Sequence, residues 1–403
     1  MRMSSDIKRA SKIMDWFADD TGISRRDRRG RRYLWTDAYA VCNFLELYLE
    51  TGAARYFQLA ADLVDLVHEI LGQHRSDDVR KGWISSLAVD EGRAYPTVGG
   101  LRIGKALNER RPGEALDEHL EWERDGQYYH YLTKWAHALC QIGAVSGDPI
   151  YGRWAIDLAR TMHRSFCHTA KAGGKKRLYW KMSIDLTRPL VDTMGHHDPL
   201  DGLITFNEIC QHQSAGVNCG LDEEVRDLGD LCRQQTWATG DLLGIGGLLF
   251  DACRLMQMGP AVVGARFEEL LDGVLVAAVS GLHYVMTRGQ LGALAEQRLA
   301  FRELGLSIGL HAVPRMDVLL REAPQIYAHT AVSDLLDQLK AVQDTATRIE
   351  TFWLNPANRQ AGSWQGHEDI NMVMLASSLL PGGFLDFHPR SNDHDKQLTA
   401  MPH

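Results

Sequence analysis

Three short segments of the chain combine aromatic, acidic and imidazole side chains. The first, residues 121–130, reads Glu-Trp-Glu-Arg-Asp-Gly-Gln-Tyr-Tyr-His and leads into an apolar helical pattern. Aromatic rings stack on the C–H faces of sugars, while carboxylates and arginine bind sugar hydroxyls, so this mixture predicts a carbohydrate site. The alternative is a helix start whose acids only complement the helix dipole. The candidate catalytic residues are Asp125 and His130, and the candidate binding residues are Trp122, Glu123, Arg124, Tyr128 and Tyr129.

Two further segments have the same character. Residues 194–202 place two adjacent histidines between acids, which puts acid–base groups with tunable pKa values side by side. Residues 364–371, Trp-Gln-Gly-His-Glu-Asp-Ile-Asn, enter the last predicted helix. The alternative for both is that the acids cap a helix, with Pro199 at a favoured first position. The candidates are His196, His197, Asp198, Asp201 and Glu368 for catalysis, and Trp364 and His367 for binding.

Weaker candidates lie at the starts of other predicted helices. Residues 35–37 and 237–241 each place a tryptophan and a threonine just ahead of an aspartate that begins an apolar helix. Helix capping is the simple explanation for such an aspartate, and lining of a cavity is the alternative. This group of candidate binding residues comprises Trp35, Asp37, Trp237, Asp241 and Arg302. His137, on the face of a tryptophan-rich helix, is predicted to be a buried histidine with a hydrogen-bond partner.

The elements that must position these residues are helices. Apolar residues recur at helical spacing in nearly every segment, and alternation with a period of two is hard to find, so strand content should be low. Residues 36–51 and 129–146 predict apolar helices that end at Gly52 and Gly147, and a second helix follows each glycine. The two copies align without a gap, which indicates a repeated antiparallel helical hairpin.

Further helix pairs are predicted along the rest of the chain. They comprise 200–212 with 222–235, 241–256 with 267–286, and 301–310 with 330–348, followed by a last helix at 369–380. About six pairs in a chain of this length favour a closed ring over an open solenoid, which would show a shorter and more regular period. The predicted fold class is therefore all-α, an (α/α)6 toroid that forms one domain over residues 1–403, with residues 1–30 packed on it. An irregular helical bundle is the alternative.

The composition excludes several classes of partner. The formal net charge is −8, whereas nucleic-acid binding needs concentrated lysine and arginine, so no nucleic acid is expected. The short basic run 25–32 is interpreted as a solvated face or a subunit contact, which leaves a homodimer open. No stretch reaches the roughly 20 uninterrupted apolar residues of a membrane span, so no membrane partner is expected.

The seven cysteines are scattered singly, and several sit on apolar helical faces. They are predicted to be reduced, buried thiols of a cytoplasmic protein. No Cys-x-x-Cys or His-x-x-x-His pair is present, so no metal is expected. The glycines at 244–247 lie inside a helical stretch without a preceding strand, which argues against a dinucleotide-binding loop. We therefore expect no cofactor.

The hairpin repeat, the helix start Tyr129-His130-Tyr131-Leu132 and the closing helix Glu368-Asp369-Ile370-Asn371 together resemble the six-hairpin (α/α)6 glycosidase-like superfamily. The nearest likeness is to the N-acylglucosamine 2-epimerase and sugar isomerase group, over about 35–166 and again over 364–403. That resemblance implies a monosaccharide bound in the ring and proton transfer by histidines on late inner helices. The chain departs from this pattern, because residues 237–250 contain no histidine and Met372 and Met374 stand where one is expected.

Three hypotheses about function follow. Relatives on that fold hydrolyse glycosides with two carboxylates, so the first is a carbohydrate-active enzyme that hydrolyses a glycoside, in which Asp125 shares acid and base roles with Glu368 or Asp201. The second is a sugar epimerase or isomerase in which His130 and His196 or His197 move a proton at the carbon next to a carbonyl. The third is a non-catalytic sugar-binding protein. In all three the expected partner is a small sugar or oligosaccharide.

Overall fold

The computed structural model describes residues 4–24, 30–169, 174–213, 219–233, 235–264 and 266–387. The chain forms two compact units, one of residues 1–17 with 235–389 and the other of residues 18–234 with 390–403, and each is described by itself. The expectation of one domain over residues 1–403 stays a prediction. Residues 25–29 of the basic run lie outside the described residues.

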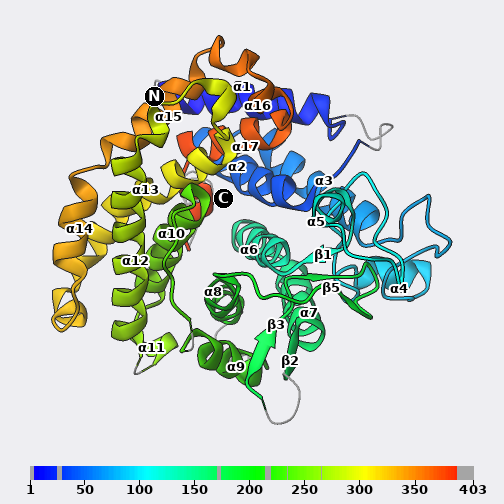
Figure 1. Cartoon of the computed structure of the whole chain (residues 1–403). Coiled ribbons are helices and arrows are strands. Elements are labelled where there is room, and N and C mark those ends of the chain that lie inside the picture. The colour runs from blue at the N-terminus through cyan, green and yellow to red at the C-terminus, as the bar shows by residue number, and fades with distance from the viewer. Residues whose placement is uncertain are drawn as a thin grey trace, which may run out of the picture. The chain divides into compact units, whose positions relative to one another are not determined.

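The unit of residues 18–234 is built from helical hairpins (Figure 1). Helix α2 (Leu34–Thr51) returns through α3 (Ala54–Leu71), and α6 (Tyr129–Ser146) returns through α7 (Pro149–Phe166). Gly52 and Gly147 end α2 and α6 with φ of 68° and 70°, a left-handed conformation that glycine adopts at little cost. The hairpin repeat predicted from the sequence is therefore confirmed.

The two helices of each hairpin differ in how they are buried. Helices α2 and α6 bury residues on nearly every side and pack against each other, whereas α3 and α7 bury one apolar stripe each. The sequence explains this difference, because a helix that is apolar all round must be covered on all sides, while an amphipathic helix can face solvent. Helices α2 and α6 are thus the inner helices of their hairpins, as the sequence predicts.

The rest of this unit contains a third hairpin and most of its short elements. Helix α8 (Asp198–Gln211) packs on α9 (Asp222–Cys232), close to the predicted bounds. The short helices α4 (Val89–Ala94) and α5 (Glu118–Glu123) lie in the long segment between α3 and α6. Strand content is low, as predicted: an antiparallel sheet of β1 (Gln127–Tyr128), β4 (Lys181–Met182) and β5 (Pro189–Val191), and a pair of β2 (Cys167–Thr169) with β3 (Lys176–Leu178).

One expectation about the cysteines is wrong. Cys210 and Cys219 form a disulfide with their Cα atoms 5.2 Å apart, while the other five cysteines are thiols. Cys210 lies in the last turn of α8 and Cys219 shortly before α9. The turn of this hairpin brings the two residues together, which their spacing in the sequence alone does not reveal.

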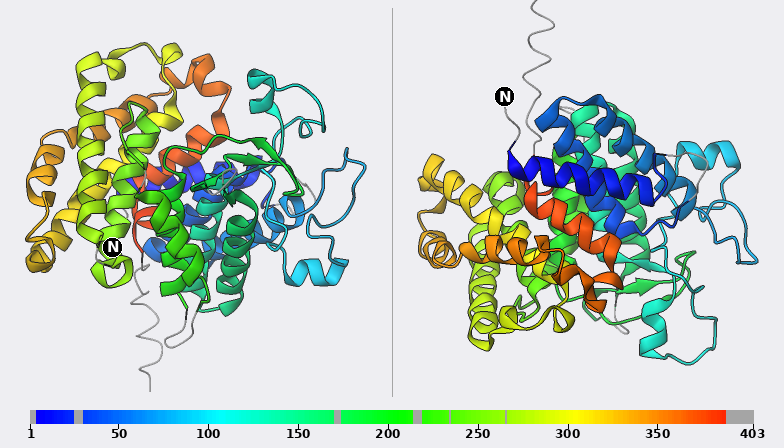
Figure 2. Two further views of the ribbon diagram at one scale, coloured as in Figure 1. Left: turned by 60° about the horizontal axis from the view of Figure 1, so that its bottom comes forward. Right: turned by 90° about the horizontal axis from the view of Figure 1, so that it is seen from above.

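The unit that contains residues 235–389 is also helical. Its larger helices are α1 (Ser5–Asp20, up to Phe17), α10 (Leu242–Met258), α12 (Phe267–Arg288), α13 (Ala300–Glu322), α14 (Val332–Lys340), α15 (Asp344–Leu354) and α17 (Glu368–Leu379). Shorter ones are α11 (Pro260–Val263), α16 (Gly362–Gln365) and α18 (Gly382–Leu385), with 3-10 turns at Gln290–Gly292, Ala295–Gln297, Pro324–Tyr327 and Asn358–Gln360. Figure 2 shows α12 running alongside α10, and both helices pack against further helices of this unit. The all-α class of helical hairpins is confirmed.

Two predicted helices have different bounds in this unit. The helix expected at 301–310 continues through Pro314 to Glu322, because residues on both sides of the proline remain buried in the core. The helix expected at 330–348 is instead two helices, α14 and α15, separated by a turn at 341–343. Periodicity of apolar residues does not locate such breaks, because both helices present an apolar stripe to the same core.

Helices α10 and α13 approach each other closely at glycines. A Cβ atom built on Gly246 would lie 2.1 Å from the carbonyl oxygen of Gly305, and one on Gly309 would lie 2.6 Å from the Cα atom of Gly246. The glycines at 244–247 therefore serve helix packing, which agrees with the sequence-based argument against a phosphate loop.

Helix α12 is long and apolar enough to cross a membrane by length and composition alone. In its most apolar window, 44% of the residues are buried inside the structure, and the helix packs on α10 and α14. Core helices pass the same test, so this helix is weak evidence for a membrane span.

Candidate functional site

The N-terminal ends of α2, α6 and α8 meet around His130. His130 is the second residue of α6, Asp198 is the first of α8, and Trp35 is the second of α2. The rings of Trp35 and His130 have centroids 6.1 Å apart, and the Nδ1 atom of His130 lies 3.7 Å from Oδ1 of Asp198. Two of the three segments selected from the sequence, together with Trp35, thus converge within one unit.

His130 and Asp198 form a pair of proton-exchanging groups. The His130 side chain is 26% exposed and the Asp198 side chain 7% exposed, so the histidine is the more accessible of the two groups. Within the described part of the chain, His130 Nδ1 and Asp198 Oδ2 are buried without a hydrogen-bond partner. Such atoms are costly to bury unless a ligand or solvent completes their hydrogen bonds, which marks this pair as a candidate reactive site.

Burial keeps both groups uncharged near neutral pH. It lowers the pKa of His130 to about 4, because the protonated ring loses its hydration. It raises the pKa of Asp198 to about 8, and the nearby Asp201 carboxylate raises it further, against the smaller opposing effects of Lys134 and Gly195. At pH 7 the imidazole is therefore free to accept a proton and the carboxylic acid is able to donate one.

Asp201 has a different environment, although it lies only one turn after Asp198 on α8. It forms an ion pair with the ammonium group of Lys134 and accepts a 2.6 Å hydrogen bond from Oγ1 of Thr133. Both partners come from α6, so Asp201 joins the two helices. Of the two carboxyl groups on this helix face, Asp201 pairs with the buried lysine, whereas Asp198 has a raised pKa and holds its proton near neutral pH.

Aromatic rings surround His130. The Trp180 ring stacks on it with an interplanar angle of 12° at 6.3 Å, and the Tyr131 ring meets it edge-on at 4.9 Å. The Tyr128 ring lies 5.3 Å away, and Trp122 contacts Trp180 edge-on at 5.1 Å. Such rings offer flat apolar faces on which the C–H groups of a sugar can stack.

Trp180 is a site residue that sequence reasoning missed. It lies in an irregular segment directly before β4, far from any of the three selected segments in sequence. The pairing of β1 with β4, which sets Tyr128 opposite Lys181, carries Trp180 to the start of α6. A lone tryptophan without a neighbouring acid or histidine gives no signal in the sequence, so only strand pairing places it.

Asp125, the first acid–base candidate, has a structural environment instead. Its carboxylate is fully buried and accepts hydrogen bonds from Arg102 at 2.9 Å, from Arg75 at 3.3 Å and from the amide of Gly104 at 2.9 Å. These contacts anchor the irregular segment between α3 and α6. A carboxylate held by two arginines without solvent access cannot serve as an accessible acid, which corrects the role expected for Asp125.

The remaining residues of the first segment lie in several environments. Glu123 is exposed, and Arg124 forms an ion pair with Glu114 at 2.6 Å. Tyr129 is fully buried with its ring 5.5 Å from that of Phe166, so it packs in the core and does not face a ligand.

Of the other candidates at these helix starts, Asp37 is held by hydrogen bonds and an ion pair, whereas His196 is exposed. Asp37 accepts a hydrogen bond from the amide of Tyr33 at 3.1 Å and pairs with buried Arg32 at 3.6 Å, so it caps α2. The His196 ring is exposed and lies 4.8 Å from the ring of His197, which occupies the capping position of α8.

The candidates in the unit of residues 235–389 form no comparable pair. Asp241 caps α10 by accepting from the amide of Gly244 and pairs with Arg302 at 2.5 Å, so the capping alternative holds for it. Trp364 is 1% exposed and stacks on Trp353 in the core. Trp237 is buried, whereas His367 and Glu368 are exposed at the start of α17. Glu368 and Asp125 thus belong to different units.

Two further histidines have buried carboxylate partners. His137 is bonded through Nδ1 to Oε1 of Glu208 at 2.6 Å, which confirms the prediction of a satisfied core histidine. His311, which the sequence did not single out, is bonded to Oε1 of Glu350 at 2.6 Å, an oxygen that also accepts from Ser378. Both pairs join neighbouring helices, α6 with α8 and α13 with α15, and so stabilise helix packing.

No protein-family model matches the chain, and no curated protein matches its sequence. Three solved structures are similar in fold. A sugar epimerase from a ruminal bacterium is 11% identical, covers 94% of this chain and 98% of its own, and has a TM-score of 0.49. The cellobiose 2-epimerase from Spirochaeta thermophila is 12% identical, with 94% and 99% covered and a TM-score of 0.47. A D-mannose isomerase is 11% identical, with 94% and 99% covered and a TM-score of 0.49.

Proposed function

We propose that this chain is a sugar epimerase or isomerase in which His130 is the general base and Asp198 the general acid. The observation that carries this proposal is the pair itself: an imidazole and a carboxyl group 3.7 Å apart, with the pKa of His130 near 4 and that of Asp198 near 8. At neutral pH a pKa near 4 leaves His130 without a proton and a pKa near 8 leaves Asp198 with one. These protonation states favour His130 as the proton acceptor and Asp198 as the donor.

The reaction uses both groups on neighbouring atoms of the sugar. His130 takes the proton from the carbon next to the carbonyl group, and Asp198 gives its proton to the carbonyl oxygen, which forms an enediol. Asp198 then recovers a proton from an enediol hydroxyl group, and the proton held by His130 returns to carbon. Return to the neighbouring carbon isomerises the sugar, and return to the opposite face of the same carbon epimerises it.

The aromatic rings around the pair suit an open-chain or cyclic monosaccharide. Trp180, Tyr131 and Trp35 lie within 6.3 Å of the His130 ring and offer apolar faces for sugar C–H groups. They also exclude water from the imidazole, which strengthens its hydrogen bonds to a ligand. Lys134, paired with Asp201, compensates the second carboxylate so that the site carries no surplus negative charge that would oppose enediolate formation.

The glycosidase hypothesis has less support. It needs two accessible carboxylates on either side of a scissile bond. Asp125 is bound by Arg75 and Arg102, and Asp201 by Lys134, so both carboxylates are already engaged in buried ion pairs. Asp198 is left as an acid without a second accessible carboxylate next to it among the described residues of this unit.

The proposal is tested by incubating the protein in D2O with a panel of reducing aldoses and ketoses and following deuterium incorporation by NMR. We expect exchange at the carbon next to the carbonyl group with at least one sugar, lost about 100-fold or more in His130→Gln and Asp198→Ala. The control is His283→Gln, an exposed histidine on α12, which should keep full exchange.

Three results would overturn the assignment. Exchange that persists in His130→Gln but is lost in His196→Gln would move the base to the loop before α8. Cleavage of aryl glycosides without exchange would restore the hydrolase hypothesis. Silence in both assays, with a sugar still raising the melting temperature, would leave a sugar-binding protein.

A further inference from the structure

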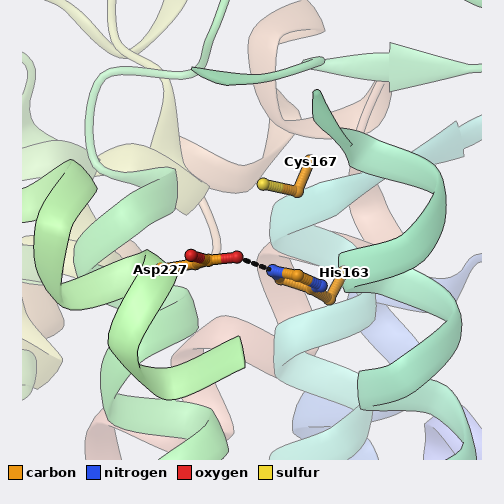
Figure 3. A group of neighbouring side chains, drawn as sticks. All are labelled: His163, Cys167 and Asp227. Carbon is orange, nitrogen blue, oxygen red and sulfur yellow. Dashed lines mark hydrogen bonds and ion pairs between the residues drawn. The ribbon is translucent and has the colours of Figure 1, made fainter. Parts of the chain in front are cut away.

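A second cluster of reactive side chains lies in the unit of residues 18–234, apart from the His130 pair. His163 lies in the last turn of α7, Cys167 begins β2, and Asp227 faces them from α9 (Figure 3). A potential ligand atom from each residue lies within 4.8 Å of those from the other two. Figure 3 shows the sulfur, the ring and the carboxylate pointing into the same space.

The present contacts of the cluster are polar and centre on one oxygen. Nε2 of His163 lies 2.8 Å from Oδ2 of Asp227, and the ammonium group of Lys176 on β3 forms an ion pair with the same oxygen. The Asp227 side chain is 11% exposed, His163 18% and Lys176 41%. A cation therefore already sits at this carboxylate, and it is carried by a flexible side chain that can withdraw into solvent.

We propose that His163, Cys167 and Asp227 bind a divalent transition-metal ion, with Zn²⁺ as the best-fitting class, in place of the Lys176 ammonium. Imidazole, thiolate and carboxylate are the donors that zinc takes in proteins, whereas Mg²⁺ and Ca²⁺ prefer oxygen alone. Zinc–ligand bonds of about 2.0–2.3 Å place the ligands of a tetrahedral site about 3.5 Å apart. Closing from 4.8 Å to that separation needs side-chain shifts of about 1 Å.

The backbone already holds the three ligands in position. Residues 163 and 167 are four apart at the end of a helix, a spacing that puts both side chains on one face. The pairing of Cys167 with Leu178 in the β2–β3 ladder fixes the cysteine, and α9 fixes Asp227. A bound ion would join the hairpin that contains α7 to the hairpin that contains α9, with the fourth position open to water. The expectation of no metal rests on the absence of Cys-x-x-Cys and His-x-x-x-His spacings, and His163, Cys167 and Asp227 follow neither pattern.

The proposal is tested with Co²⁺, whose visible spectrum reports thiolate ligation and coordination number. Titration of the full chain should give a thiolate-to-cobalt charge-transfer band that saturates at one equivalent and is displaced by Zn²⁺. Cys167→Ser should abolish the band, and the other four thiols that remain serve as the internal control. Asp227→Asn should weaken binding about tenfold or more.

Lys176→Gln separates metal binding from a mere ion-pair cluster. Removing the competing ammonium should tighten Co²⁺ binding about fivefold, whereas the same variant should lose stability without any spectral change if the cluster only forms ion pairs. Because the Lys176 side chain is 41% exposed, its substitution should leave the protein folded, so this variant can test the proposal even if Cys167→Ser does not fold. Absence of a saturating band, or a band that survives in folded Cys167→Ser, would overturn the proposal.

Discussion

Single residues in this protein acquire their chemistry from a few neighbours. Asp198 and Asp201 lie one turn apart on α8, yet Asp201 meets Lys134 and Thr133 while Asp198 faces His130 and aromatic rings. The same side chain is therefore an ion-pair partner at one position and a carboxyl group with a raised pKa at the other. His130 shows the complementary effect, because burial lowers its pKa to about 4 and keeps the ring unprotonated at neutral pH.

The pKa shifts predict how stability depends on pH. The pKa of Asp198 is raised from 3.8 to about 8, so the folded state keeps a proton that the unfolded state loses. The stability gained from this difference is complete below pH 3.8 and is lost as pH rises through 8. The pKa of His130 is lowered from 6.5 to about 4, so the folded state loses a proton that the unfolded state still binds at acid pH. Stability therefore rises with pH through this range, and the rise is complete above pH 6.5. Between pH 6.5 and 8 only the Asp198 effect should change.

Asp198→Asn should remove the loss of stability that occurs as pH rises through 8. We expect urea unfolding to show the variant gaining about 2 kcal/mol relative to the wild type between pH 6.5 and 8.5, since each pKa unit corresponds to about 1.4 kcal/mol. Asp90→Asn, at a fully exposed carboxylate on α4, is the control and should show no pH-dependent difference. A constant difference between Asp198→Asn and the wild type over this range would contradict the raised pKa.

At the scale of elements, helix starts collect the chemistry and glycines set the packing. Helices α6 and α8 each follow the returning helix of the preceding hairpin, and the starts of α2, α6 and α8 bring Trp35, His130 and Asp198 together. In the other unit, Gly246 of α10 lies against Gly305 of α13, where any side chain would meet backbone atoms.

The glycine contact gives a prediction about stability. In Gly246→Ala the new Cβ would lie 2.1 Å from the carbonyl oxygen of Gly305, so the helices must separate and unfolding free energy should fall by about 2–3 kcal/mol. Gly247→Ala is the matched control on the same helix, because its Cβ would find only the tip of Phe250 at 3.7 Å. That variant should gain up to about 1 kcal/mol from helix propensity. Equal effects of the two substitutions in denaturant titrations would show that α10 and α13 are not in close contact.

At the scale of the whole molecule, a disulfide and a buried ion-pair cluster hold the connections between helices. The disulfide between Cys210 and Cys219 joins the last turn of α8, the helix that begins with Asp198, to the residues just before α9. Asp125 holds Arg75 and Arg102 and so fixes the long segment between α3 and α6. The Asp125 cluster stabilises a segment that contains little regular structure of its own.

The disulfide predicts a thiol count and a loss of stability on reduction. The unfolded, unreduced protein should show five reactive thiols of its seven cysteines. Reduction should lower the unfolding free energy by about 2–3 kcal/mol, because a closed loop of this length restricts the unfolded chain. A Cys210→Ala/Cys219→Ala double variant should melt at the lower temperature with or without reductant. Seven thiols in the unreduced protein would refute the disulfide.

The sequence by itself determined which segments are helices and where the inner helices begin. Apolar periodicity and terminal glycines act locally, so the α2–α3 and α6–α7 hairpins and their caps follow from residues close in the chain. The same local rules placed His130 and Asp198 at helix starts, and they identified His137 as a core histidine.

The tertiary structure alone decided the environment of each of these residues. Asp125, Asp198 and Asp201 have the same side chain but different neighbours from distant parts of the chain. Two arginines bind Asp125, a histidine lies next to Asp198, and a lysine pairs with Asp201. Trp180 likewise reaches His130 through strand pairing. Charge interactions and desolvation depend on distances in space, which local sequence patterns do not encode.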